Sequence, residues 1–191
     1  DSSRFVPWSV RPVEHYLARH YFPIREIAPH DLARAVLFDL TPAPPPTAPT
    51  WPDMPVGATF GDALRLVGAD LPAGGEVRSG EVLAVSLLWE ALTPIEQDYT
   101  VALLLISAQG ELVAQRDSLP VNGFAPMSGW SPGALMRDNH GLELPASLPP
   151  GDYALWAVVY WWQTPTERLP VTSSAGLSLG DHALIATVTV R

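Results

Sequence analysis

Apolar and polar residues alternate along much of the chain beyond residue 58, and this pattern predicts β-strands. Leu83, Val85 and Leu87 are separated by less apolar neighbours, which is the period-two pattern of a half-buried strand. Two other stretches, 99–106 and 153–162, are apolar at nearly every position, as the central strands of a sheet are. We expect strands at 63–68, 82–90, 99–107, 111–117, 153–162 and 185–190.

Short runs of turn-forming residues separate the predicted strands, and no helical pattern interrupts them. Turns are expected at Gly74-Gly75, Gln109-Gly110, Asn122-Gly123 and Pro149–Asp152. Short strands at such regular spacing are typical of a two-layer β fold. Residues 58–191 are therefore predicted to form an all-β domain, an antiparallel β-sandwich of the immunoglobulin-like or jelly-roll-like kind, with about seven or eight strands.

Residues 1–40 show a different pattern, that of a short helix followed by a strand. Pro12 suits the first turn of a helix, and apolar side chains recur at helical spacing up to residue 21. We expect a helix at 12–21 and a strand at 33–40. So short a segment cannot bury a core of its own, and it is predicted to dock on the sandwich. The side chains expected to make this contact are Val13, Tyr16, Leu17, Tyr21, Val36 and Phe38.

Between these parts lies a proline-rich stretch, 41–57, which we interpret as a linker. Seven of the 21 prolines of the chain fall between Thr41 and Pro55. Such a segment lacks amide donors and favours the polyproline II conformation, so it is expected to act as a stiff spacer.

Composition and charge argue against several classes of partner. The formal net charge is −9, with 11 basic residues scattered among 20 acidic ones, so nucleic acid and anionic lipid are unfavourable partners. The longest apolar runs are about half of the roughly 20 residues that span a bilayer, so this fragment is not expected to insert in a membrane. The chain opens on Asp1 without a methionine, and we expect it to be part of a larger protein.

One short motif resembles the nucleophile elbow of serine hydrolases. Residues 129–133 read Gly-Trp-Ser-Pro-Gly, a formal G-x-S-x-G centred on Ser131. In that elbow the residue after the serine donates its backbone N–H to the oxyanion hole, and Pro132 has no N–H to donate. A hydrolase built on Ser131, with His140 or His182 as the base, is therefore the least favoured alternative.

Neither a metal site nor a catalytic constellation is predicted. The five histidines form no recognised ligand spacing, and the chain has no cysteine. The acidic residues Asp117, Asp138, Asp152 and Asp181 lie beside predicted turns, where carboxylates commonly accept turn amides. We expect no cofactor, no metal and no catalytic residue. A calcium ion held by one of these strand-end loops is the weaker alternative, because the loops are not rich in acidic residues.

The tryptophans are a stronger indication of function than the histidines or the carboxylates. The chain has seven tryptophans, and the adjacent pair Trp161 and Trp162 is predicted to end a long apolar strand, just before Gln163. An exposed tryptophan beside polar groups can stack on a sugar ring. Trp161, Trp162, Gln163 and Trp130 are therefore the candidate ligand-binding residues. The alternative is that these rings pack against the first 40 residues or a neighbouring domain.

Several stretches together resemble one family. They are WEALTPIEQDYTV (89–101), GELVAQRDSLP (110–120), PMSGWSPGALMRD (126–138) and LPPGDYALW (148–156). This pattern resembles the C-terminal soluble module of bacterial membrane glycosyltransferases of the dolichyl-phosphate-mannose protein mannosyltransferase type, found in Chloroflexus-like bacteria. The resemblance implies an extracytoplasmic module at the cell membrane, whose partner is the membrane portion of the parent protein. In such enzymes the catalytic acids lie in that membrane portion.

The leading expectation is thus a non-catalytic accessory module of a membrane glycosyltransferase, serving acceptor binding, positioning or structural support. A carbohydrate-binding module that uses its exposed tryptophans is the second reading.

Overall fold

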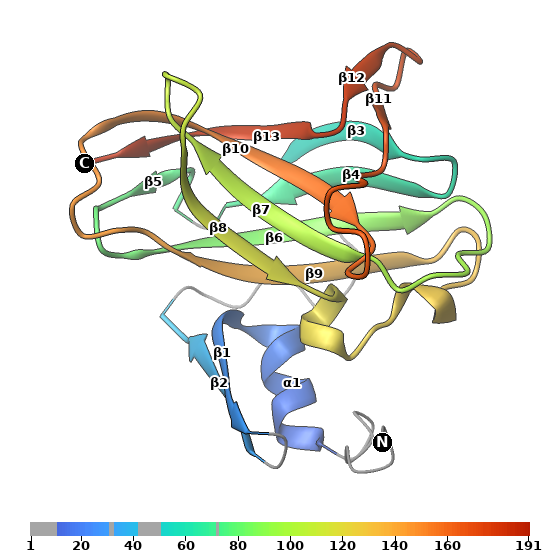
Figure 1. Ribbon diagram of the computed structural model, residues 1–191, viewed down its shortest axis with the longest axis horizontal. Helices are drawn as coiled ribbons and strands as arrows, with labels where there is room; N and C mark the ends of the chain where they lie inside the picture. Colours follow the sequence, from blue (N-terminus) through green and yellow to red (C-terminus); the bar gives the residue numbers. More distant parts are fainter. Residues whose placement is uncertain (1–10, 31–32, 42–50, 72) are drawn as a thin grey trace.

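The protein is a two-layer antiparallel β-sandwich with a small helix-and-hairpin segment packed beneath it (Figure 1). The computed structural model describes residues 11–30, 33–41, 51–71 and 73–191. The all-β prediction is confirmed. The elements are α1 (Pro12–His20), β1 (Phe22–His30), β2 (Ala33–Asp39), β3 (Met54–Phe60), β4 (Leu64–Asp70), β5 (Glu76–Val77), β6 (Val82–Ala91), β7 (Thr100–Ile106), β8 (Leu112–Ser118), β9 (Leu135–Glu143), β10 (Gly151–Tyr160), β11 (Val171–Thr172), β12 (Ser178–Gly180) and β13 (Ala183–Val190), with 3-10 turns η3 (Pro120–Gly123) and η4 (Met127–Gly129).

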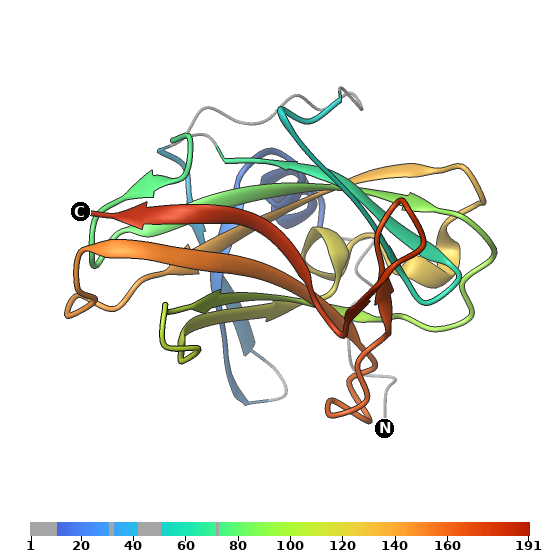
Figure 2. The ribbon, with the colours of Figure 1, turned by 90° about the horizontal axis from the view of Figure 1, so that it is seen from above.

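One layer has the strand order β5-β13-β10-β7-β8, and the other has the order β12-β11-β3-β4-β6-β9. Among the described residues, all strand pairs are antiparallel except β13 with the short β5. The two layers are seen edge-on in Figure 2, and β8 of one sheet contacts β9 of the other along one side of the sandwich. The core lies between the sheets, where Phe60 meets Trp89 edge-on with ring centroids 5.5 Å apart.

The central strands form because apolar residues occupy both of their faces. Every residue of β7 is buried, and β6 is buried at most positions. β-Branched and leucine side chains of this kind pack well on a pleated surface, and on β7 the outward-facing residues are buried under side chains of the same sheet. The inner face supplies the main core, whereas the outer face of β7 and β10 carries a separate apolar cluster of Ala102, Leu104, Ile106 and Val158.

The first part of the chain packs against the β9 side of the six-stranded sheet. The helix and β1 both contact β9, and Phe22 is fully buried. The buried face of the helix differs from the expected stripe, because Ala18 is buried while Val13 and Tyr16 are 71% and 56% exposed. Val36 and Phe38 are half-buried and line a cavity of about 360 Å³ beside the helix.

Glycine allows other segments to approach the outer face of the six-stranded sheet closely. A side chain at Gly141 would meet Ile24 Cγ1 at 3.1 Å and the backbone of β1 at 3.3 Å. A side chain at Gly68 would meet the Pro52 ring at 2.5 Å and the carbonyl oxygen of Met54. Neither position tolerates a Cβ atom without displacement of the segment that crosses it.

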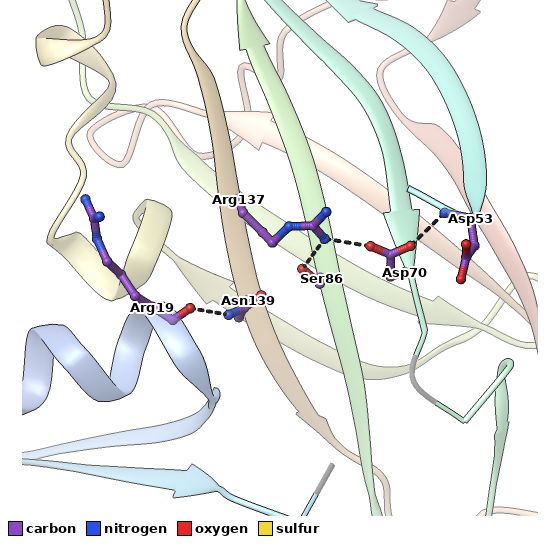
Figure 3. A network of polar contacts seen from close by, with 6 residues as sticks. All are labelled: Arg19, Asp53, Asp70, Ser86, Arg137 and Asn139. Carbon is purple, nitrogen blue, oxygen red and sulfur yellow. Dashed lines mark hydrogen bonds and ion pairs between the residues drawn. The ribbon is translucent and has the colours of Figure 1, made fainter. Parts of the chain in front are cut away.

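Two groups of polar contacts, which share the strand β9, tie these segments to the sheet (Figure 3). Arg137 Nη1 lies 2.6 Å from Asp70 Oδ2 and donates to Ser86 Oγ at 3.1 Å. Asp70 also accepts the backbone N–H of Asp53 at 2.7 Å, and Asn139 Nδ2 donates to the carbonyl oxygen of Arg19 at 3.1 Å. Together these contacts link the end of the helix, three strands and the segment that leads into β3.

Several expectations about element bounds are corrected. β3 begins at Met54, inside the stretch 41–57 that was interpreted as a linker, and residues 42–50 of that stretch lie outside the described residues. β1 and β9 were not predicted at all. β10 ends at Tyr160, so Trp161 and Trp162 lie in the following loop and not in the strand. No helix in the described ranges combines the length and apolarity that a membrane crossing needs.

Candidate functional site

The outer face of the five-stranded sheet is the surface of the molecule that most resembles a binding site. It is turned toward the reader in Figure 1, and no described helix lies in front of β7 and β10. Its floor is the apolar cluster around Leu104 and Val158. The half-buried rings of Trp156 and Tyr160, both on β10, pack on this floor. We call this surface, bounded by Gln115, Asp117, Trp156, Tyr160, Arg168, Asp181 and His182, the open face.

Trp156 is held in one orientation by a neighbouring ring. The imidazole of His182 stacks on the indole, with ring centroids 3.9 Å apart and an angle of 20° between the planes. His182 Nδ1 lies 2.9 Å from Asp181 Oδ1, which in turn fixes the imidazole. The imidazole covers one face of the indole, so a ligand meets only the part of the ring that stays exposed. Because the ring is already ordered, it loses little conformational entropy when a ligand binds there.

Tyr160 reaches across the sheet to the edge strand β8. Its phenol donates to Asp117 Oδ1 at 3.2 Å, and Gln115 Nε2 donates to Asp117 Oδ2 at 2.7 Å. Burial of the phenol and the negative charge of Asp117 raise the pKa of Tyr160 to about 12. The phenol is therefore neutral and Asp117 accepts hydrogen bonds from two neutral groups, each carboxylate oxygen keeping a lone pair for a further donor.

An ion pair closes the opposite side of the open face. Arg168 Nη1 lies 3.2 Å from Asp181 Oδ2. The hydrogen bond from His182 and the charge of Arg168 lower the pKa of Asp181 despite some burial. Arg168 also forms a backbone bridge with Tyr160. The bridge joins the loop after β10 to the strand that carries both aromatic rings, and the ion pair joins that loop to the turn between β12 and β13.

The loop of 161–170 places the expected site residues at one end of the open face. Trp162 is 63% exposed, Gln163 is exposed and Trp161 is half-buried. A turn closes where Thr164 N donates to the carbonyl oxygen of Trp161 at 2.9 Å. These three residues thus lie beside the open face but do not form its floor, which comes from β7 and β10.

Trp130 is a core residue, so its expected role as an exposed stacking platform is wrong. Its side chain is 6% exposed and belongs to the core cluster between the sheets. The indole Nε1 donates to the carbonyl oxygen of Ala125 at 3.1 Å. The ring therefore fixes the 122–133 loop and offers no surface to a ligand.

Ser131 forms no hydrogen bond with a histidine in the part of the chain that the structure describes. His140 lies elsewhere, in a buried polar cluster between β8 and β9. Its Nε2 lies 2.7 Å from Asp138 Oδ2, and its Nδ1 lies 3.4 Å from Ser118 Oγ. Both the histidine and the aspartate side chains are 0% exposed.

This buried cluster shapes a strained turn. The backbone N–H of Val121 donates to Asp138 Oδ1 at 2.8 Å, and Val121 adopts φ 52°, a left-handed conformation that is costly for a β-branched residue. The carboxylate compensates that strain, and Val121 in turn packs against Ala18 of the helix. Asp138 was expected beside a turn. It lies in the middle of a strand instead, although it does accept a turn amide.

Sequence reasoning did not identify most of the open-face residues as candidate site residues. Trp156, Tyr160, Gln115 and Asp117 sit within predicted strands, and only the alternation of strand faces could have placed them together on the outside. Trp156 on β10 lies opposite Leu104 on β7, and Leu104 lies opposite Gln115 on β8. No local sequence pattern reveals the register that places Leu104 opposite Gln115. Among the described residues, no three His, Asp or Glu side chains gather as metal ligands would.

Comparisons with known proteins add a distant structural likeness. No protein-family model matches the chain, and no curated protein matches it. Among solved structures, the crystal structure of the C-terminal domain of wzt aligns with a TM-score of 0.46 and 13% sequence identity. The alignment covers 70% of this chain and 77% of that one. At such low identity and TM-score the likeness says nothing about function.

Proposed function

We propose that this protein is a non-catalytic carbohydrate-binding module, and that the open face binds an oligosaccharide. The observation that carries the proposal is the combination of two aromatic rings on an apolar floor with carboxylate, amide and phenol groups at its rim. A sugar ring has apolar faces and a polar edge, so it can stack on an aromatic ring while its hydroxyls bond to such a rim.

The spacing of the two rings favours a chain of sugars over a single one. Trp156 and Tyr160 are four residues apart on one strand, a distance of about 13 Å along the strand at about 3.3 Å per residue. Trp162, which is 63% exposed, follows two residues after the end of β10 and is a further aromatic side chain that a longer ligand could reach. A ligand that spans these positions must contain more than one ring.

The module's place in a larger protein is part of the same proposal. The sequence resemblance to a soluble module of membrane glycosyltransferases supports a location on the extracytoplasmic side of the cell membrane. There the open face would hold or position an acceptor glycan while the membrane portion of the parent protein performs the transfer. The buried state of Asp138 and His140 supports a structural use of that cluster and not catalysis.

The proposal is tested by titrating a panel of neutral and acidic oligosaccharides of the cell envelope and following tryptophan fluorescence and heat. We expect saturable binding with a millimolar to high-micromolar Kd, about 4–6 kcal/mol, because hydrogen bonds to the rim replace bonds to water. Trp156→Ala should weaken binding at least tenfold, about 1.4 kcal/mol.

Trp51→Ala is the matched control. Trp51 is 79% exposed but precedes β3, away from the open face, so its loss should leave affinity unchanged. Trp162→Ala measures the contribution of the loop. If no saccharide binds, or if Trp51→Ala weakens binding as much as Trp156→Ala, the open face is not a sugar site.

A further inference from the structure

Charged side chains border the open face, and their arrangement predicts which glycans it accepts. Two carboxylates, Asp117 and Asp181, border the face, together with the one guanidinium of Arg168. Arg168 and Asp181 form an ion pair and offset each other. Asp117 accepts hydrogen bonds from Tyr160 and Gln115, both neutral, and has no ion-pair partner among the described residues.

Asp117 is placed to accept hydrogen bonds from a ligand. It is exposed, and its two oxygens are already oriented by Tyr160 and Gln115. The pKa of Tyr160, about 12, keeps the phenol protonated, so Tyr160 continues to donate to the carboxylate at any physiological pH. An ionised carboxylate accepts stronger hydrogen bonds than a neutral oxygen, and its two oxygens suit two neighbouring hydroxyls.

We propose that the open face selects neutral, hydroxyl-rich glycans over acidic ones, with Asp117 as the residue that determines this specificity. The inference rests on the proposed carbohydrate-binding function and names its ligand class. A uronic-acid carboxylate near Asp117 brings two like charges together, and the overall charge of −9 adds to the repulsion. A neutral sugar instead donates its hydroxyls to the same carboxylate.

The test compares saccharides that differ only in the acidic group. β-1,4-Linked mannotetraose and β-1,4-linked tetramannuronate share a backbone and differ at the C6 carboxylate; cellotetraose and its glucuronate counterpart form a second pair. By calorimetry at low ionic strength we expect the neutral member to bind at least fivefold more tightly. That ratio should shrink in 1 M salt, where the Debye length falls to about 3 Å.

Asp117→Asn is the diagnostic variant, because asparagine keeps an acceptor oxygen for Tyr160 but removes the charge. It should weaken neutral binding at least threefold and reduce the neutral-to-acidic ratio toward one. Glu81→Gln is the matched control, since Glu81 is exposed in the turn before β6 of the other sheet and the change in total charge is identical. It should leave the ratio unchanged.

The outcomes separate the two proposals. Equal binding of both members of a pair, or tighter binding of the acidic member, overturns the selectivity while the carbohydrate-binding function stands. A ratio that Glu81→Gln alters as much as Asp117→Asn assigns the effect to total charge and removes Asp117 from the role. Absence of binding to every member of both pairs overturns the carbohydrate-binding function itself.

Discussion

The two outer faces of this sandwich are built from similar strands but differ in what covers them. On the six-stranded sheet, β1 crosses Gly141 and the Pro52–Met54 segment crosses Gly68, so other parts of the chain cover it. On the five-stranded sheet the apolar floor is shielded by the rings of Trp156 and Tyr160 from the sheet itself. On the six-stranded sheet, glycine leaves room for another segment of the chain to pack closely. On the five-stranded sheet, large aromatic side chains lie between the apolar cluster and solvent.

The polar groups of the two outer faces also differ in burial and in hydrogen bonding. Those of the covered face are largely buried and bond to the chain: the side chain of Arg137 is 7% exposed and holds Asp70 and Ser86. Those of the open face, including Gln115 and Asp117, are exposed and bond to one another. A group that is buried and bonded contributes to stability, whereas a group that is exposed and oriented remains available to a ligand. The comparison teaches that coverage by other segments, more than residue type, distinguishes the two outer faces of this sandwich.

The largest expected effect contrasts a covered ring with an open one. Phe22→Ala removes a fully buried ring beneath the sheet and should lower the free energy of unfolding by about 3–5 kcal/mol. Trp156→Ala removes a half-buried ring and should cost about 1–2 kcal/mol, since less apolar area leaves the interior. Denaturant unfolding of both variants measures the difference. Equal losses would mean that the open face is simply a second core.

A smaller effect is expected where a segment crosses the covered face. Gly68→Ala forces Pro52 and Met54 away from β4 and should cost about 1–3 kcal/mol. Gly129→Ala is the matched control, because nothing lies within 4 Å of a side chain at that position. Thermal unfolding compares the two variants. A neutral Gly68→Ala would show that the crossing segment does not pack tightly on the sheet.

A more local effect is expected at the end of α1. Asn139→Ala removes the hydrogen bond to the carbonyl oxygen of Arg19 and should cost about 1 kcal/mol. Hydrogen exchange should then accelerate in the helix and leave β7, in the other sheet, unchanged. Faster exchange spread evenly over both sheets would contradict a local role for this bond.

The smallest effect is a titration on the open face. The phenol of Tyr160 should ionise at a pKa of about 12, above the ordinary value of 10.0. Because the folded-state pKa is raised, the stabilisation from this phenol is complete below pH of about 10 and is lost as pH rises toward 12. Asp117→Asn should lower the pKa of Tyr160, because the negative charge beside it disappears. Ultraviolet absorbance of the phenolate measures both, and an unchanged pKa in the variant would contradict the contact.

Much of the sandwich was predictable because its central strands have a clear local sequence pattern. The apolar runs of β6, β7 and β10 bury both faces, so composition and period agree there. β9 was missed because its middle carries Asp138, Asn139 and His140, which read as a polar loop. Their burial depends on partners from β8, η3 and α1 that are distant in the sequence.

The tryptophans that the sequence put forward for ligand binding differ in exposure. Trp162 is exposed and Trp161 is half-buried, and their role in binding stays a prediction. Trp130 was misplaced because a tryptophan between turn residues looks exposed, whereas its indole folds back into the core and bonds to Ala125.

The sequence by itself determined the all-β class, the positions of the central strands and the lack of cysteine chemistry, since each follows from local pattern or composition. Only the tertiary structure decided which face would be covered and which left open. Gln115 and Asp117 become part of one surface with Trp156 and Tyr160 through the register of three strands. Register is a long-range property, because shifting one strand by a single residue would turn every one of its side chains to the opposite face.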